Sequence, residues 1–543
     1  MLKGTLEQIT ICGKKKIPGQ SAVDAMTFAV ADPENPIRDS QGNVRSMWLY
    51  KPSSGIIPCS SGIFILRDGR DRASAEELLE KTGWAERAER DHYLILLPDP
   101  SEEWNAAADP SLPDDYGYIT GLLQSGPPNY LIGCKVHRTS RYLAGFGEKA
   151  ATLAAGIAKA HAELLAGLYL EGAADPELAP GGAPEGTDCP IPVWAVDCDE
   201  ALVDVFRERA LQAHTICRTF SKADKTIYEK AWDSLFFGMR RMATGVYGSL
   251  VHKDSVEEMG LQMHYDETFL GDNGGMAHEW YEYVPIGLSA DRPIPLVLVL
   301  HGGGTSAKYC AEQTRWQELA EKYGFVVLYP QACIASVWNP GMDSRLPSDE
   351  AYLLKLFAYA CGKYPIDQTR VYCTGFSMGG LMSHAMGMTH PEIFAAIAPF
   401  SGLFFDDYWD EPYQIRSRFE AVKAEAKEEG RDVRMPVFQV HGTMDKTWQG
   451  DELDRMLSFW AKWNRIDVPF TDAKKAEGVF MIQGDDSRFH VYDSRLEDGT
   501  VFYRFVSVQD LPHGVDLRTP YMAWDFLSAF SREADGTLVV KRG

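Results

Sequence analysis

The second half of the chain alternates short apolar runs with longer amphipathic segments. Residues 296–300, 325–329 and 370–374 are short runs rich in branched and aromatic side chains, and the segment 316–323 has helical periodicity. This alternation is typical of parallel strands that are joined by crossover helices. From about residue 280 onward we therefore expect a layered α/β domain, in which helices flank a mostly parallel sheet.

A Gly-x-Ser-x-Gly motif follows the third of these runs. Ser377 lies at its centre, between Gly375 and Gly379, and the apolar segment 381–388 after it is typical of a helix. Small residues two positions either side of a serine allow the sharp strand-to-helix turn that exposes a nucleophilic hydroxyl. The motif is weak by itself, but its place between a strand and a helix predicts that Ser377 is a catalytic nucleophile.

Three glycines follow His301 directly after the first run. Glycine allows backbone N–H groups to approach a substrate oxygen closely, so this loop and the amide of Met378 can form an oxyanion hole. We favour Gly303 as the donor in the loop, with Gly304 as the next candidate. The alternative interpretation is a glycine-rich turn with no special purpose.

Two later strand ends offer an acid and a base. Residues 436–440 lead to Asp445 and residues 502–508 lead to His513, in the order Ser, Asp, His that α/β-hydrolases show. Asp445 is expected to orient the imidazole of His513, which transfers the proton of the serine. Several rivals do not end a strand in this order: Asp410, Asp451, His384, His390 and His490.

Four segments, LVLVLHGGG, GFSMGG, VHGTMD and LPHG, resemble the polyhydroxybutyrate (PHB) depolymerase and feruloyl esterase-like group, which overlaps carbohydrate esterase family one. A predicted closing helix over residues 523–532 adds to the resemblance, which covers about residues 280–532. It implies an α/β-hydrolase fold and carboxylic ester hydrolysis without a metal or organic cofactor. By similarity Trp338 lines the acyl pocket, although a buried aromatic plug explains it equally well. Phe376 and Gly304 are further substrate-binding candidates, and the aromatic segment 404–409 lies where lids insert.

An internal repeat occupies the first half. Residues 82–98 align without gaps on residues 314–330, and the runs 63–66, 142–146 and 191–196 extend the match. RDGR replaces HGGG there, and Gly147 stands where the second copy has the serine. We therefore expect tandem α/β-hydrolase-like domains: a degenerate, inactive domain over 1–230, a helical and glycine-rich connector over 231–275, and a catalytic domain over 276–543.

Charge and composition narrow the range of partners. The chain has 77 acidic and 54 basic residues and a net charge of −23, which disfavours nucleic acid and anionic membranes. The first residues lack the apolar core of a signal peptide, and no run is long enough to span a bilayer, which predicts a cytoplasmic protein. The expected partner is a small or oligomeric ester, and a homo-oligomer is left open.

The leading hypothesis is a serine carboxylic ester hydrolase that forms an acyl-enzyme. We expect a soluble oligomeric or small substrate, such as a hydroxyalkanoate, a feruloyl or other aryl ester, or an acetylated sugar. One alternative is a serine peptidase of the prolyl-oligopeptidase type, although the first half repeats the hydrolase and shows no blade-length β repeat. The other is a non-enzymatic binding protein with two domains, which the intact residues of the second copy disfavour.

Overall fold

The computed structural model describes most of the chain, namely residues 2–15, 31–39, 41–53, 59–107, 109–127, 129–132, 135–172, 191–212, 217–241, 250–252, 254–266, 268–269, 278–289, 291–333, 338–340, 347–402, 415–445, 452–466, 489–509, 511 and 513–541. The chain divides into two compact units, Met1–Lys253 and Asp254–Gly543. None of the described helices is both long enough and apolar enough to cross a membrane.

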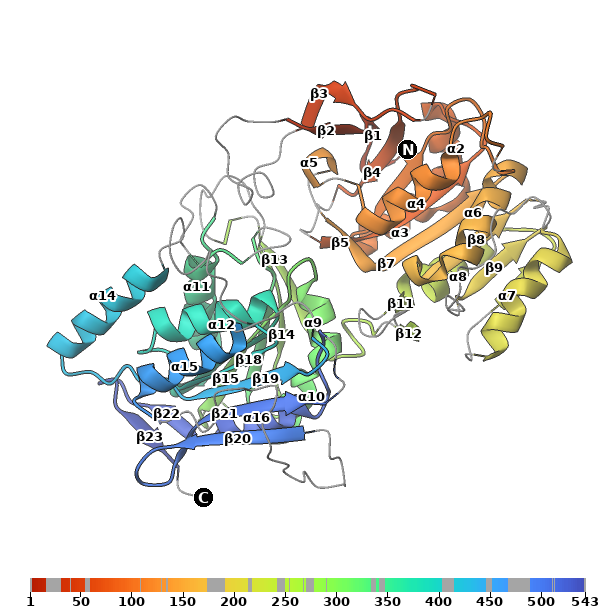
Figure 1. Ribbon diagram of the computed structural model, residues 1–543. Coiled ribbons are helices and arrows are strands. Elements are labelled where there is room, and N and C mark those ends of the chain that lie inside the picture. The colour runs from red at the N-terminus through yellow and green to blue at the C-terminus, as the bar shows by residue number, and fades with distance from the viewer. Residues whose placement is uncertain are drawn as a thin grey trace. The chain divides into compact units, whose positions relative to one another are not determined.

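A nine-stranded sheet forms the centre of the second unit (Figure 1). Its strands follow the order β13-β14-β16-β15-β17-β18-β19-β21-β20. The strands from β16 to β21 run parallel, whereas β13, β14 and β20 pair antiparallel with their neighbours. The bounds are β13 (Gln262–Asp266), β14 (His278–Tyr283), β15 (Ile294–Leu300), β16 (Val326–Pro330), β17 (Ile366–Phe376), β18 (Ala396–Phe400), β19 (Val437–Gly442), β20 (Phe489–Arg495) and β21 (Val501–Val508).

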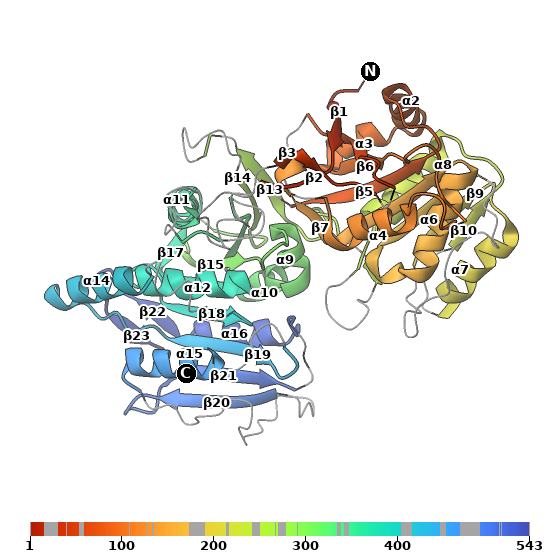
Figure 2. The same cartoon turned by 45° about the horizontal axis from the view of Figure 1, so that its top comes forward.

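Helices bury apolar side chains on both faces of this sheet. One face packs against α9 (Ala307–Thr314), α10 (Trp316–Tyr323) and α16 (Thr519–Leu527). The other packs against α11 (Asp349–Lys363), α12 (Met378–Thr389) and α15 (Glu452–Asn464), and Figure 2 shows α12 lying along β18. Because both faces are covered, β15 and β16 are buried along their whole length. The fold class predicted for this half is confirmed.

The first unit is built on an eight-stranded sheet with the same plan. The order β1-β4-β6-β5-β7-β8-β9-β10 again places two antiparallel strands at one edge and parallel strands after them. The bounds are β1 (Thr5–Thr10), β4 (Ser46–Lys51), β5 (Cys59–Arg67), β6 (Leu94–Pro98), β7 (Lys135–Phe146), β8 (Gly167–Glu171), β9 (Val193–Val196) and β10 (Cys217–Phe220). The second unit has one more strand, β20, beyond the position of β10.

Details of register confirm the internal repeat. Helix α3 (Trp84–Asp91) and β6 occupy the positions that α10 and β16 occupy in the second unit, with the same spacing as in the sequence alignment. The pairing of β5 with β7 shifts register between Ser60 and Gly62, and that of β15 with β17 shifts between Ile294 and Leu296. The same register shift therefore occurs at the equivalent pair of strands in both units, which supports the conclusion that the two units are copies of one fold.

The helical part of the predicted connector belongs to the first unit, contrary to the expectation from the sequence. Helix α8 (Lys225–Ala231) and the π-helical turn η2 (Trp232–Phe237) bury their aromatic side chains against α2 (Arg72–Thr82), α3 and the sheet. The strand β11 (Met239–Arg241) follows them. At the other end of the connector, β13 is an edge strand of the second sheet. The aromatic residues at helical spacing in this segment, such as Trp232 and Phe236, therefore belong to the hydrophobic core of the first unit and not to a linker.

These elements complete the first repeat. Tyr142 donates a hydrogen bond of 2.6 Å to the carbonyl of Met239, and Tyr372 donates one of 2.8 Å to the carbonyl of Phe530. Residues 225–241 are therefore the counterpart of α16 and the strand β22 (Phe530–Arg532). The closing helix predicted over 523–532 also needs correction, because α16 ends at Leu527 and its last residues form β22.

Candidate active site

Ser377 occupies the turn between β17 and α12. Its backbone angles, φ 56° and ψ −116°, lie in a region that residues with a Cβ rarely adopt. Its N–H donates a hydrogen bond of 2.8 Å to the carbonyl of Phe400 in the neighbouring strand. A Cβ on Gly379 would lie 2.1 Å from the carbonyl oxygen of Leu300, so this turn requires glycine there. The sequence motif therefore forms the tight elbow that it predicted.

Three predicted residues meet at this elbow. The Nε2 atom of His513 lies 2.9 Å from Oγ of Ser377, and its Nδ1 atom lies 2.8 Å from Oδ2 of Asp445. The carboxylate of Asp445 is fully buried, while 22% of the His513 side chain is exposed. The ring of Phe376 packs 4.8 Å from the imidazole, measured between ring centroids. The geometry is that of a nucleophile, a base and an orienting carboxylate.

Backbone hydrogen bonds hold the acid and base loops together. The N–H of Thr443 donates to the carbonyl of Val508 at 3.0 Å, and that of Met444 donates to the carbonyl of Leu511 at 3.1 Å. These bonds continue the pairing of β19 with β21 beyond the strand ends. Asp445 and His513 therefore lie side by side because the two strands that carry them are neighbours.

The buried side chain of His301 anchors the glycine loop through hydrogen bonds to the backbone. Its Nε2 atom accepts a hydrogen bond of 3.0 Å from the backbone N–H of Ala332, so the ring proton is on Nδ1, which lies 2.8 Å from the carbonyl of Gly302. Burial lowers the pKa of His301 to about 4. The imidazole is therefore neutral near pH 7, and its partners make it a structural anchor for the loop.

Gln331 completes this anchor, and the sequence interpretation missed it. Its Nε2 atom lies 2.9 Å from Nε2 of His301, and its Oε1 atom accepts a hydrogen bond of 2.9 Å from the N–H of Ala307. The side chain is 3% exposed and spans the loop from beginning to end. The signal that could have found it is its position directly after Pro330, at the end of β16.

The predicted oxyanion donors come from two segments, the glycine loop after β15 and the first turn of α12. Gly303 is exposed, and Gly304 is buried with a φ of 66°. The hydroxyl of Thr305 donates to the carbonyl of Gly302 at 2.7 Å and restrains the loop. Met378 is the first residue of α12, where a helix leaves the N–H without an intrahelical partner. The choice of Gly303 over Gly304 stays a prediction.

Trp338 is a buried aromatic side chain, which agrees with one of the two interpretations that the sequence allowed. Its side chain is 1% exposed, and its indole N–H donates a hydrogen bond of 2.8 Å to the carbonyl of His301. The indole therefore fills the space behind the glycine loop and fixes that carbonyl. A direct contact between Trp338 and an acyl group stays a prediction.

Two of the rival bases have other partners, and the third lies on an edge strand. His384 is buried and accepts a hydrogen bond of 2.9 Å from the indole of Trp460, and burial lowers its pKa to about 3. His390 lies 2.7 Å from Glu350, and His490 is on β20 opposite Ser507. The rival carboxylates Asp410 and Asp451 and the aromatic segment 404–409 lie outside the described residues. In the part of the chain that the structure describes, no group of three acidic, histidine or cysteine side chains could hold a metal ion.

Comparison with known proteins shows which family the sequence around this site resembles. Residues 279–479 match the family described as esterase PHB depolymerase. The chain is 27% identical over 252 residues to feruloyl esterase B of Talaromyces stipitatus, and the match covers 41% of this chain and 68% of that protein. It is 34% identical over 140 residues to the probable acetylxylan esterase A of Aspergillus fumigatus, which covers 25% of this chain and 37% of that protein. The second unit, which contains the matched residues 279–479, is PHB depolymerase- and feruloyl esterase-like.

The named relatives of this hydrolase are esterases, and it falls in the class of carboxylic ester hydrolases. Its match to a second feruloyl esterase B, from Neurospora crassa, is 34% identical over 128 residues and spans 43% of that protein. Among solved structures, acetyl xylan esterase from Aspergillus awamori is 20% identical with a TM-score of 0.39, over 49% of this chain and 99% of that one.

Proposed function

We propose that the hydrolase cleaves carboxylic esters through an acyl-enzyme, with Ser377 as the nucleophile. The observation that supports this most is the pair of contacts at His513, 2.9 Å to the serine hydroxyl and 2.8 Å to the buried carboxylate of Asp445. A base within hydrogen-bond reach of the nucleophile, itself oriented by a third group, is the arrangement that nucleophilic catalysis requires.

In the first half-reaction, Oγ of Ser377 attacks the ester carbonyl carbon and its proton passes to Nε2 of His513. Asp445 stabilises the imidazolium through the N–H at Nδ1. The oxyanion accepts hydrogen bonds from the amide of Met378 and from a glycine of the loop after His301. His513 then returns the proton to the alkoxide oxygen as the C–O bond breaks, and the alcohol leaves.

Water completes the cycle. His513 takes a proton from a water molecule that attacks the acyl-enzyme, and the acid is released as the serine regains its proton. The N-terminus of α12 points at the reacting centre, so its dipole favours the negative charge that develops there. Apart from the ester and water, the steps of this proposal use groups of this chain.

For the substrate, we propose a soluble small or oligomeric ester, either a feruloyl or other aryl ester, an acetylated sugar or a hydroxyalkanoate. The esterase relatives support this range, and the side chain of Met444, 53% exposed next to Asp445, supplies an apolar surface near the triad. The oligomeric state and the cytoplasmic location expected from the sequence stay predictions.

The test is a panel of acetyl, feruloyl and hydroxybutyryl esters, assayed with the full chain and with Ser377→Ala. We expect turnover of at least one ester class and its loss in the variant. Ser528→Ala is the matched control, because this serine lies at the end of α16 with its hydroxyl bonded to the carbonyl of Asp525. Binding without turnover across the panel would favour the non-enzymatic alternative, and cleavage of peptides alone would favour the peptidase.

A further inference from the structure

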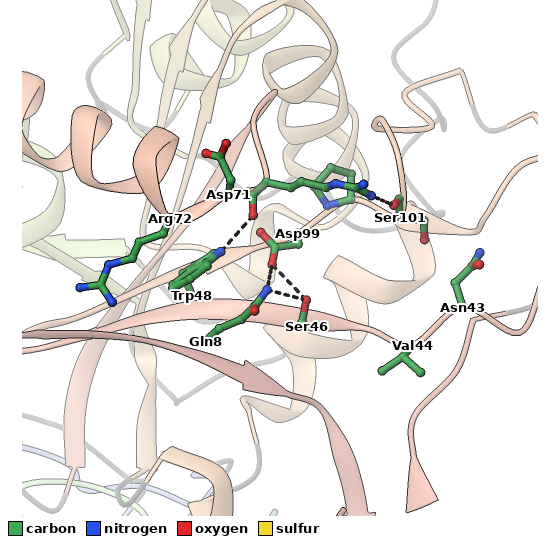
Figure 3. Close-up of a pocket in the computed structure, with 11 residues that line it drawn as sticks. Gln8, Asn43, Val44, Ser46, Trp48, Asp71, Arg72, Asp99 and Ser101 are labelled. Carbon is green, nitrogen blue, oxygen red and sulfur yellow. Dashed lines mark hydrogen bonds between the residues drawn. The ribbon is translucent and has the colours of Figure 1, made fainter.

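A polar cavity of about 420 Å³ opens in the first unit (Figure 3). Ser46, at the start of β4, and Asp99, directly after β6, line its floor. This is the edge of the sheet where parallel strands end, which is where open α/β sheets bind ligands. The volume is within the range of about 300–1,000 Å³ that small-molecule sites occupy. All of the residues that line it belong to the first unit.

The carboxylate of Asp99, which lines the cavity, is fixed by hydrogen bonds. Asp99 is 5% exposed, and its Oδ2 atom accepts hydrogen bonds from Ser46 at 3.0 Å and from Gln8 at 3.3 Å, as Figure 3 shows. Its Oδ1 atom lies 3.1 Å from the guanidinium of Arg67. A carboxylate offers about four acceptor positions, so these three hydrogen bonds do not use all of them.

The cavity carries no net charge. Two arginines, Arg70 and Arg72, balance two aspartates, Asp71 and Asp99. Arg70 donates to the carbonyl of Ser101 at 2.6 Å, and Asp71 accepts from the N–H of Ser74 in the first turn of α2. These charges already have partners inside the protein, so a strongly ionic ligand gains little here.

An apolar wall faces this polar floor. The indole of Trp48 is 9% exposed and is fixed by a hydrogen bond of 3.0 Å from its N–H to the carbonyl of Arg70. Val44, 42% exposed, lies at the rim. A neutral ring that has an apolar C–H face and a border of hydroxyl groups suits an aromatic wall beside closely spaced amide, hydroxyl and carboxylate groups.

The second unit uses the equivalent positions differently. Asp99 aligns with Gln331 and Arg67 aligns with His301, so an ion pair in the first unit replaces the pair of side chains that anchors the glycine loop in the second. We propose that this cavity is a binding site for a neutral saccharide. The degenerate unit would then supply recognition of a carbohydrate that is separate from ester cleavage.

The test measures binding of the neutral trisaccharides xylotriose, cellotriose and maltotriose to the full chain by isothermal titration calorimetry and saturation-transfer NMR. None of the three has an ester bond, so turnover does not interfere. Val44→Trp fills the cavity from its exposed rim, and Gln8→Ala removes an exposed amide that borders it. Val539→Trp is the matched control, because this valine is 39% exposed in the second unit.

We expect at least one trisaccharide to bind with millimolar affinity or better, and Val44→Trp to weaken that binding at least about tenfold. Gln8→Ala should weaken it less, and Val539→Trp should leave it unchanged. Absence of saturation by all three sugars at about 10 mM, in a sample that hydrolyses p-nitrophenyl acetate, overturns the proposal and leaves the esterase proposal intact. Equal binding by native protein and Val44→Trp, or displacement of the sugar by sulfate alone, also overturns it.

Discussion

The two elbows of the chain both have a residue with a positive φ, but different side chains fill them. In the second unit the turn after β17 exposes Ser377, whereas in the first unit Gly147 follows β7 with a φ of 95°. A Cβ on Gly147 would lie 2.0 Å from Oδ2 of Asp68, whose other oxygen accepts a hydrogen bond of 3.2 Å from the N–H of Ala150. An aspartate of the first unit therefore occupies the space that a nucleophile would need.

A second difference concerns the base. Residues 509–518 join β21 to α16 and carry His513, whereas residues 221–224 alone join β10 to α8. The support behind the loops is nevertheless the same, because the indole of Trp104 donates to the carbonyl of Arg67 at 2.7 Å just as Trp338 donates to that of His301. The comparison shows that the two units share the same core and strand register although only the second carries the serine, aspartate and histidine at its loops.

The largest expected effect separates the two elbows directly. Ser377→Ala should lower kcat for the best ester by about 10⁴-fold or more, because the other members of the triad have no nucleophile to activate. The measurement is steady-state hydrolysis, with thermal unfolding as a check on folding. Activity within tenfold of the native enzyme would mean that another group, in either unit, performs the reaction.

The next effect tests the anchor that distinguishes the second unit. Gln331→Ala should lower kcat by about 10²-fold with little change in KM, because a loosened glycine loop stabilises the oxyanion less in the transition state. Gln317→Ala is the matched control, since both glutamines are 3% exposed but Gln317 bonds to Tyr329 on the face of the sheet that packs against α10. Equal kcat losses in the two variants would contradict a positioning role for Gln331.

A smaller effect concerns the histidines that end the helices after the elbows. His161 and His390 each lie 3.1 Å from a glutamate two residues later, and His390 also lies 2.7 Å from Glu350. Burial opposes protonation of His390, but its hydrogen bonds to the two carboxylates outweigh burial and raise its pKa to about 9.

Because the folded pKa of His390 exceeds the ordinary value of about 6.5, its stabilising contribution is complete below that pH and disappears as the pH rises through 9. The second unit should lose about 3 kcal/mol of unfolding free energy between about pH 6 and pH 9.5. Hydrogen exchange of its peptides measures this loss, which His390→Gln should abolish and His161→Gln should not. A loss of the same size in His390→Gln would assign it to other groups.

The smallest expected effect concerns a serine placed at the first elbow, where it tests whether that unit can show esterase activity. Gly147→Ser should create no esterase activity and should destabilise the first unit by about 1 kcal/mol, through the positive φ and the contact with Asp68. Gly42→Ser is the matched control, because its φ of 87° is similar but a Cβ there meets nothing within 4 Å. Denaturant unfolding compares the two, and an active Gly147→Ser would contradict the view that the short loop of residues 221–224 supplies no base.

The sequence predicted the parts of the molecule that local pattern controls. The buried strands, the elbow at Ser377 and the order of Asp445 and His513 all follow from hydrophobic period and from motifs at strand ends. Residues 231–241 were assigned to the connector because closure of the first repeat depends on long-range contacts. One of these is the bond from Arg241 to the carbonyl of Leu165, which matches the bond from Arg532 to the carbonyl of Phe394. Gln331 was missed because a single glutamine carries no motif.

The most direct test of the central claim is covalent labelling by a fluorophosphonate, followed by peptide mapping of the full chain. We predict a single adduct, on Ser377, that is absent from Ser377→Ala and has no counterpart on any peptide of residues 1–253. An unlabelled Ser377 in protein that hydrolyses p-nitrophenyl acetate, together with undiminished hydrolysis by Ser377→Ala, would contradict the account.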